Sequence, residues 1–196
     1  MVEIEKKTKS YFVLTKAANK LFHKYGIRKV SVEELCKEAR ISKMTFYRLF
    51  KNKEQLVKHI LVEDFEQNFA KQKKLFDQDI PFTDIIQQSL KYKRNSAKRY
   101  SKEFVSDLYT AKDQELVKLM HDFGEKGRAF FKKFLIRSQQ EGHIRKNIKI
   151  DFVMHYLEKM QEKMIDETFL NLFDNVEELS VELTNMFFYG ILSNPK

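Results

Sequence analysis

Glycine and proline are unusually scarce in this chain, and their scarcity restricts the folds that it can adopt. The 196 residues include 5 Gly and 2 Pro, whereas an average chain of this length would have roughly 14 Gly and 10 Pro. Sheets joined by tight turns need both residue types, because glycine supplies positive φ and proline presets the turn geometry. We therefore predict an all-α fold of long helices with few connections.

Apolar residues recur at helical spacing in the first part of the chain. A continuous apolar stripe on one helix face comprises Leu14, Ala17, Ala18, Leu21, Phe22 and Tyr25. Gly26 follows at the position where a left-handed residue would end that helix. Ser31 and Glu34 then predict a capping box at the start of a short helix that runs to about Ala39. Ser42 predicts the N-cap of a second short helix.

Helical patterns continue along the rest of the chain. A polar break at residues 51–53 precedes a longer helix, and further helices are predicted near 85–90, 104–109, 114–140, 151–173 and 176–192. The longest uncharged apolar run near a terminus, Met186–Leu192, is far shorter than the roughly 18 residues of a membrane span. The N-terminus has no apolar stretch of signal-peptide length, so a cytoplasmic location is expected.

The net charge of the chain is concentrated in its first third. Residues 1–60 contain 15 Lys and Arg against 6 Asp and Glu, a net of +9, whereas residues 61–196 contain 22 of each. A local excess of this size favours binding to a polyanion, either nucleic acid or an anionic membrane surface.

The two short helices after Gly26 have the arrangement of a helix-turn-helix unit. On the second of them we expect a buried face of Ile41, Phe46, Leu49 and Phe50 and a solvent face of Lys43, Met44, Thr45, Tyr47 and Arg48. The helix N-termini at Ser31 and Ser42 present backbone N–H groups to phosphate oxygens, and Lys51 and Lys53 are further phosphate contacts. An ordinary helical hairpin with a basic surface is the alternative, but the charge asymmetry and the aromatic spacing favour DNA binding.

Three stretches of this region carry a resemblance to a known family. They are Ala17-Ala18-x-x-Leu21-Phe22-x-x-x-Gly26, then Val30-Ser31-Val32-x-x-Leu35, then Ile41-Ser42-x-x-Thr45-Phe46-Tyr47-x-x-Phe50-x-x-Lys53-x-x-Leu56. Residues 14–58 thereby resemble the DNA-binding domain of the TetR family of bacterial transcriptional regulators. The resemblance implies a helix-turn-helix domain over residues 1–55, and an all-helical effector-binding and dimerisation domain over residues 56–196.

The same resemblance implies the partners and the site residues. The expected partners are a palindromic DNA operator, a small-molecule effector and a second copy of the chain, and the expected function is a repressor that a lipophilic effector releases from DNA. Base edges or adjacent phosphates would be contacted by Lys43, Met44, Thr45 and Arg48, and the DNA backbone would be held by Ser31, Thr45, Tyr47 and Lys53. Two positions depart from the family pattern: Arg40 stands where glycine is usual in the turn, and Met44 stands where a small residue is common.

Two further sets of residues follow from the resemblance, each with an alternative. The candidate effector-binding residues are Phe104, Tyr109, Phe123, Phe130, Tyr156 and Met160, which could equally be filled core. The candidate dimer interface lies on the helices near 151–173 and 176–192 and comprises Val153, Leu157, Met164, Leu179, Leu183, Met186 and Phe187, which could also be intramolecular core. The basic run from Lys91 to Lys102 has two interpretations as well, a site for an anionic effector or a solvated face.

Other patterns favour structural roles. Cys36, the single cysteine, is expected to pack in the core rather than act as a redox switch. A face with Asp151, His155, Glu158 and Glu162 is expected to be a solvated stripe rather than a metal site. No Glu is followed by His three residues later, the spacing that a di-iron helical bundle needs. We therefore predict no metal, no cofactor and no enzymatic activity, and a membrane-surface adaptor is the remaining alternative.

Overall fold

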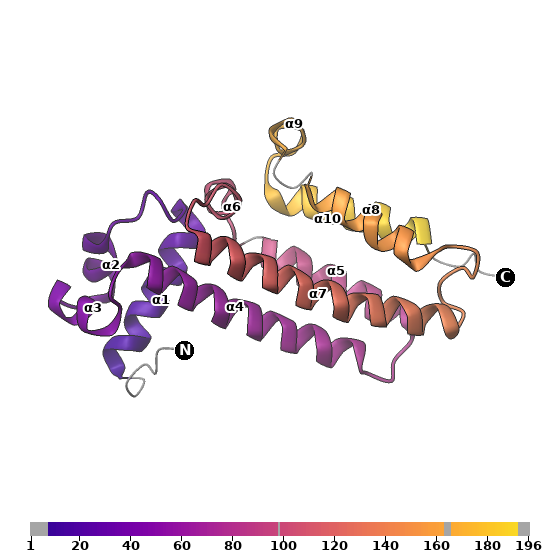
Figure 1. Cartoon of the computed structure of the whole chain (residues 1–196), viewed down its shortest axis with the longest axis horizontal. Helices are drawn as coiled ribbons and strands as arrows, with labels where there is room; N and C mark the ends of the chain where they lie inside the picture. The colour runs from indigo at the N-terminus through magenta and orange to yellow at the C-terminus, as the bar shows by residue number, and fades with distance from the viewer. Residues whose placement is uncertain (1–7, 98, 163–165, 192–196) are drawn as a thin grey trace. The chain divides into compact units, whose positions relative to one another are not determined.

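A computed structural model of the chain describes residues 8–97, 99–162 and 166–191, and it confirms the all-α prediction (Figure 1). No strand occurs within these three ranges. The helices form two compact units. The first unit comprises Met1–Gln67 and Tyr100–Leu116, and the second comprises Asn68–Arg99 and Val117–Lys196. The functional division at residue 55 stays a prediction.

The first unit contains four whole helices and parts of others. These are α1 (Lys9–Tyr25), α2 (Val32–Ala39), α3 (Lys43–Leu49), the first part of α4 (Lys53–Phe76) and α6 (Lys102–Tyr109). Most of the predicted stripe on α1 is buried, including Leu14, Ala18 and Phe22. Tyr25, the last residue of α1, is the exception in this stripe, since its side chain is exposed.

The helix ends in the first unit follow the predicted signals. Gly26 ends α1 with φ +87° and ψ 163°, so its φ is positive as expected but its ψ is extended rather than left-handed helical. Ser31 and Glu34 form the predicted capping box on α2, and the Ser42 side chain caps α3 by accepting a hydrogen bond from the backbone of Thr45. Arg40 adopts the left-handed conformation itself, with φ 53° and ψ 46°, so the turn keeps the geometry for which glycine is the usual residue.

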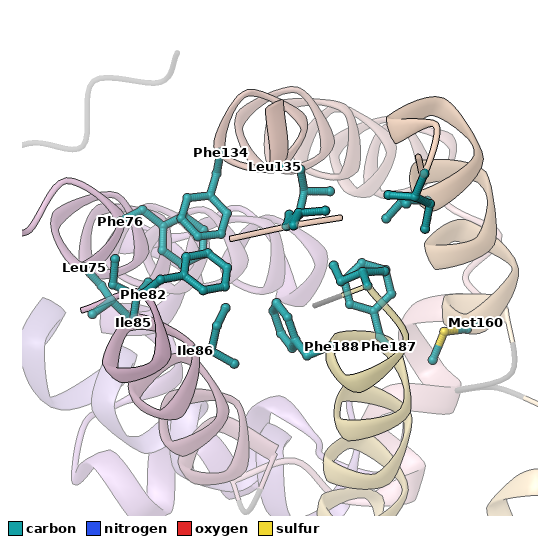
Figure 2. Close-up of a cluster of buried hydrophobic side chains, with 14 residues drawn as sticks. Leu75, Phe76, Phe82, Ile85, Ile86, Phe134, Leu135, Met160, Phe187 and Phe188 are labelled. Carbon is teal, nitrogen blue, oxygen red and sulfur yellow. The ribbon is translucent and has the colours of Figure 1, made fainter. Parts of the chain in front are cut away.

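The second unit is built around phenylalanine. It contains the rest of α4, α5 (Phe82–Ala97), most of α7 (Gln114–Gln140), α8 (Ile150–Glu162), α9 (Glu167–Leu170) and α10 (Val176–Ile191). The Phe134 ring stacks on Phe76 with centroids 4.0 Å apart and on Phe82 at 5.9 Å. Figure 2 shows these rings gathered on one side of the cluster, with Phe187 and Phe188 entering it from α10.

One predicted helix is interrupted. Instead of a continuous helix over 151–173, α8 ends at Glu162 and the short α9 begins at Glu167. Asp166 accepts a hydrogen bond from the backbone N–H of Thr168 at 3.0 Å, so its side chain satisfies a donor at a new helix start. No helix within the described ranges is long and apolar enough to cross a membrane.

Candidate nucleic-acid interface

Two buried phenylalanines hold α3 against the first unit. Phe46 and Phe50 are almost completely buried, whereas Ile41 and Leu49 are half-buried. Burying side chains of this size stabilises the docked helix by roughly 1.5–3 kcal/mol each. The four residues predicted for the buried face are thus buried or half-buried, and their packing holds the opposite face of α3 toward solvent.

That opposite face is polar, basic and open. Met44 is 80% exposed and Tyr47 is 55% exposed, and Lys43 and Arg48 are also exposed. Thr45 is half-buried, and its hydroxyl shares a hydrogen bond with the Ser42 hydroxyl at 3.0 Å. Four of the five predicted solvent-facing side chains are thus brought together on one accessible face.

The Ser31 side chain is already engaged within the capping box. Its hydroxyl donates to Glu34 Oε2 at 2.9 Å, and its backbone N–H donates to the same oxygen at 2.8 Å. The hydroxyl also accepts from the Glu34 backbone N–H at 3.2 Å. These hydrogen bonds, the backbone one first, hold the pKa of Glu34 below its usual range. A phosphate at this position would compete with the Glu34 carboxylate for the same donors.

Lys43 also has a partner within the chain. Its ammonium forms a hydrogen-bonded ion pair with Glu33 Oε1 in the first turn of α2, and both side chains remain largely exposed. The hydrogen bond raises the pKa of Lys43 and lowers the pKa of Glu33, so both groups are charged at neutral pH. Nothing in the local sequence indicates this pair, because its members are ten positions apart on different helices.

Lys53 faces the connection between α1 and α2. Its ammonium donates to the carbonyl oxygens of Ile27 and Val30, each at 3.0 Å. An ammonium has three donors, so one N–H remains for a phosphate. Lys51, in contrast, is exposed.

Polar contacts fix α1 against α4 within the first unit. The buried Tyr11 hydroxyl donates to Glu63 Oε1 at 2.7 Å and lies 2.5 Å from His59 Nε2. Burial, followed by the hydrogen bond to Glu63, raises the pKa of Tyr11. The buried His23 places Nε2 3.1 Å from an oxygen of Asp64. These contacts keep the helices that support α3 in one arrangement.

No local pattern in the sequence indicates that α6 belongs to the first unit. The Ser101 backbone N–H donates to the His23 carbonyl at 2.8 Å, and the Phe104 ring lies 4.7 Å from the His23 ring. Asp107 accepts from the backbone N–H of Arg28 at 2.9 Å. Because these partners are about 80 residues apart in sequence, only the folded chain brings them together.

Comparison with known proteins identifies this arrangement. Residues 14–60 match the family model for bacterial regulatory proteins of the TetR family. The matched segment includes α2, α3 and the turn between them, which are the elements that present the exposed basic face.

Residues 14–60 are a DNA-binding domain of the TetR family of bacterial regulatory proteins.

Solved structures share the fold over nearly the whole chain. A transcriptional regulator from Saccharomonospora viridis in complex with choline is 12% identical with a TM-score of 0.75, and covers 93% of this chain and 97% of its own. The regulator FadR from Bacillus subtilis in complex with stearoyl-CoA is 14% identical with a TM-score of 0.68, covering 92% and 99%. The regulatory protein TetR from Rhodobacter sphaeroides is 18% identical with a TM-score of 0.68, covering 94% and 100%. No curated protein matches the chain.

The candidate effector-binding residues are distributed over both units. Phe104 packs in the first unit beside His23, and Tyr109, also in the first unit, is 53% exposed. In the second unit, Phe130 stacks on Phe76 at 5.6 Å and Met160 is buried. The two other candidates in that unit differ in exposure: Phe123 is half-buried and Tyr156 is exposed.

The second unit also has an open pocket of about 370 Å³ between the α4–α5 connection and the end of α7. It is lined by Asp77, Gln78, Asp79, Ile80, Phe82, Ile85, Phe134, Arg137, Ser138, Glu141 and His143. Arg137 pairs with Glu141 at 3.8 Å and with Asp77 at 4.0 Å, so much of this charge is balanced internally. None of the candidate effector-binding residues lines this pocket.

The predicted interface residues differ in their exposure. Val153, Leu179 and Phe187 are buried within the second unit, Leu157 and Leu183 are half-buried, and Met186 is exposed; Met164 lies outside the described residues. Other large apolar side chains are exposed on the same helices, namely Phe152 and Tyr156 on α8 and Tyr189 on α10.

The remaining sequence expectations concern single residues and small groups. Cys36 is buried, and burial raises the pKa of its thiol, as expected of a core residue. Among the described residues, no group of His, Cys, Asp or Glu has an arrangement that could hold a metal ion. In the basic run, Lys98 and the side chains of Lys93 and Arg94 lie outside the described residues.

Proposed function

We propose that this regulator binds a palindromic operator as a homodimer and acts as a repressor that a small lipophilic effector releases from DNA. The observation that carries the proposal is the exposed face of α3. Lys43, Met44, Tyr47 and Arg48 point to solvent on a helix anchored by two buried phenylalanines, within a segment that holds the whole +9 of the chain. A helix with this combination fits the major groove, where its side chains contact base edges and phosphates.

Base reading and backbone binding are divided among these side chains. Arg48 can donate two hydrogen bonds to guanine, and Met44 can contact a thymine methyl group. Tyr47, Lys51 and the remaining donor of Lys53 contact phosphates, which fixes the register of α3 without adding sequence preference. Ser31 contributes by holding the first turn of α2 through its capping box.

A second copy of the chain would cover the exposed apolar side chains of α8 and α10. Phe152 and Tyr156 lie one turn apart on α8, and Met186 and Tyr189 lie one turn apart on α10. Large exposed apolar side chains grouped on neighbouring helices are typical of a protein interface. Dimerisation also suits DNA recognition, because two half-sites about 34–36 Å apart provide the sequence information that a single helix lacks.

The effector is proposed to bind in the second unit. Its core is rich in phenylalanine, and apolar pockets with few polar groups suit lipophilic ligands. Two structural relatives are solved with stearoyl-CoA and with choline, and the apolar core favours the acyl compound. Release from DNA requires that the effector bind the DNA-free conformation more tightly than the DNA-bound one.

The decisive experiment is selection of bound duplexes from a random pool, followed by measurement of affinity at several salt concentrations. We expect a palindrome and a steep salt dependence, because phosphate contacts release counterions. Selection of no duplex would refute the assignment. Stearoyl-CoA should then weaken binding to the selected palindrome, whereas free coenzyme A and choline serve as controls for the acyl chain and for a polar cation.

A further inference from the structure

The acidic side chain of Glu33 lies on the face that is proposed to meet DNA. It belongs to the first turn of α2 and pairs with Lys43, the first residue of α3, and its carboxylate also accepts a hydrogen bond from its own backbone N–H. Its neighbour Glu34 is occupied by the capping box, but Glu33 is not part of that box. A carboxylate that is not part of the capping box therefore lies beside the N-terminal end of α3.

The pair with Lys43 orients this carboxylate and leaves part of it free. The ion pair uses Oε1 of Glu33, and an ionised carboxylate has about four acceptor sites on its two oxygens. Both side chains are more than half exposed, so the unused acceptor sites face solvent. Met44, which is adjacent to Lys43 in sequence, is 80% exposed at the same end of α3.

This arrangement has opposite consequences for two kinds of DNA. A duplex that offers only phosphates must separate Lys43 from Glu33 or accept the negative charge of Glu33 next to its backbone, and either change weakens binding. A duplex with a base amino group at this position supplies a donor to the carboxylate. In the major groove, the amino group at N4 of cytosine is the donor that suits Glu.

We propose that Glu33 is a specificity-determining residue that accepts a hydrogen bond from a cytosine amino group in each half-site and disfavours DNA that lacks it. Lys43 is the positioning residue that holds the carboxylate in place. This inference rests on the proposed DNA-binding function. It assigns to α2 a part in reading the sequence, in addition to the phosphate contacts proposed for that helix.

The test repeats the selection from a random duplex pool with wild type and with Glu33→Gln. We expect the wild-type operator to contain one cytosine position per half-site that becomes degenerate with the variant. The ratio of operator affinity to random-sequence affinity should fall by roughly tenfold, the size expected for loss of one specific base contact. Affinity for random-sequence DNA should rise, and its log–log salt slope should steepen by about one per protomer, because Lys43 becomes free for a phosphate.

Two further variants make the result specific. Glu38→Gln is the matched control, because Glu38 is an exposed acid on the same helix that pairs with Lys20 at 2.7 Å; it should leave the selected sequence unchanged. Adding Lys43→Gln to Glu33→Gln should remove the steeper salt slope. An identical consensus and affinity ratio for wild type and Glu33→Gln would overturn the inference while leaving the proposed function standing. Failure of the wild type to select any duplex would instead refute the proposed function.

Discussion

At the scale of single residues, the first unit depends on side chains that satisfy backbone groups in the turns. Arg40 occupies a left-handed conformation between α2 and α3, and its backbone N–H still donates to the carbonyl of Lys37 at 3.2 Å. Lys53 holds two carbonyls of the α1–α2 connection. Both residues are basic and close to the DNA-binding face. Different substitutions are therefore needed to distinguish what each residue contributes to folding from what its charge contributes to DNA binding.

Replacing Arg40 by glycine should stabilise the protein. A left-handed non-glycine residue costs roughly 1–2 kcal/mol, and glycine removes that cost while adding conformational entropy to the unfolded chain worth about 0.5–1 kcal/mol. We expect Arg40→Gly to raise the free energy of unfolding by about 0.5–1 kcal/mol in denaturant titration. Arg40→Ala, which removes the charge but keeps the strain, should show no such gain. Equal stability of the two variants would contradict the role assigned to the backbone.

Replacing Lys53 should affect both folding and DNA binding. Lys53→Met leaves the carbonyls of Ile27 and Val30 without their donor, which should lower the free energy of unfolding by about 1–3 kcal/mol. It should also reduce the salt slope of operator binding by about one. The exposed Lys51 is the control: Lys51→Met should reduce the salt slope without a loss of stability. If the free energy of unfolding falls equally in both variants, the hydrogen bonds of Lys53 to the α1–α2 connection are not the cause of the loss of stability.

At the scale of elements, the helices of the first unit depend on two kinds of interaction. Some are local and can be recognised in the sequence of one helix, and others join residues that are distant in sequence. The capping box of α2 and the N-cap of α3 are recognisable because their partners lie within four residues, and the buried face of α3 is recognisable from the spacing of its apolar residues. The pair Glu33–Lys43, the contacts of Lys53 and the docking of α6 on α1 join residues that are distant in sequence, so no periodicity predicts them. The break between α8 and α9 escaped prediction because the apolar spacing continues across it.

The capping box of α2 should contribute to stability in a pH-dependent way. Its hydrogen bonds lower the pKa of Glu34 in the folded protein from the ordinary value of 4.5, so the ionised form favours folding. The stabilisation relative to Glu34→Gln is therefore present at neutral pH and shrinks as the pH falls below about 4.5. Denaturant titrations of both proteins from pH 7 to pH 3 measure the difference. A difference that stays constant from pH 7 to pH 3 would contradict the role assigned to the ionised Glu34 carboxylate.

Gly26 should be essential for the contact between α1 and α6. Its φ of +87° is strained for other residues, and a Cβ there would lie 2.8 Å from Asp107 Oδ2 and 3.0 Å from Glu103 Cβ. We expect Gly26→Ala to lower the free energy of unfolding by roughly 1–3 kcal/mol. Gly142 has nearly the same φ, +88°, but no neighbouring atom lies within 4 Å of the position that a Cβ would take. Gly142→Ala should therefore lower the free energy of unfolding by less than Gly26→Ala does. An equal decrease in both variants would show that the close approach of α6 to Gly26 adds nothing to the cost of the substitution.

At the scale of the whole molecule, the chain separates a basic DNA-binding end from a neutral remainder. The 22 basic and 22 acidic residues after position 60 balance, and the second unit contributes a phenylalanine core and exposed apolar side chains. Dimerisation would double the +9 of the N-terminal segment, so the affinity of a dimer for DNA should depend on salt more steeply than that of a monomer.

Disrupting the proposed interface should separate the protomers and weaken operator binding. Tyr189 on α10 is 79% exposed, and Tyr189→Glu would place a charge among apolar side chains of the partner. We expect sedimentation equilibrium to change from dimer to monomer and operator affinity to fall at least tenfold, while helicity is unchanged. Tyr92 on α5 is also exposed, and Tyr92→Glu should remain dimeric. A dimeric Tyr189→Glu protein would argue against an interface at this part of α10.

The burial of Cys36 has a practical consequence for measuring the response to an effector. It is the only cysteine in the sequence and is buried in α2, so thiol-reactive probes should react with it slowly in the native protein. A cysteine introduced at an exposed position near α3, such as Lys51→Cys, would then take up a spin label almost exclusively. In a dimer, the two labels would report the spacing of the recognition helices by pulsed electron paramagnetic resonance, with and without effector, on an otherwise unaltered protein.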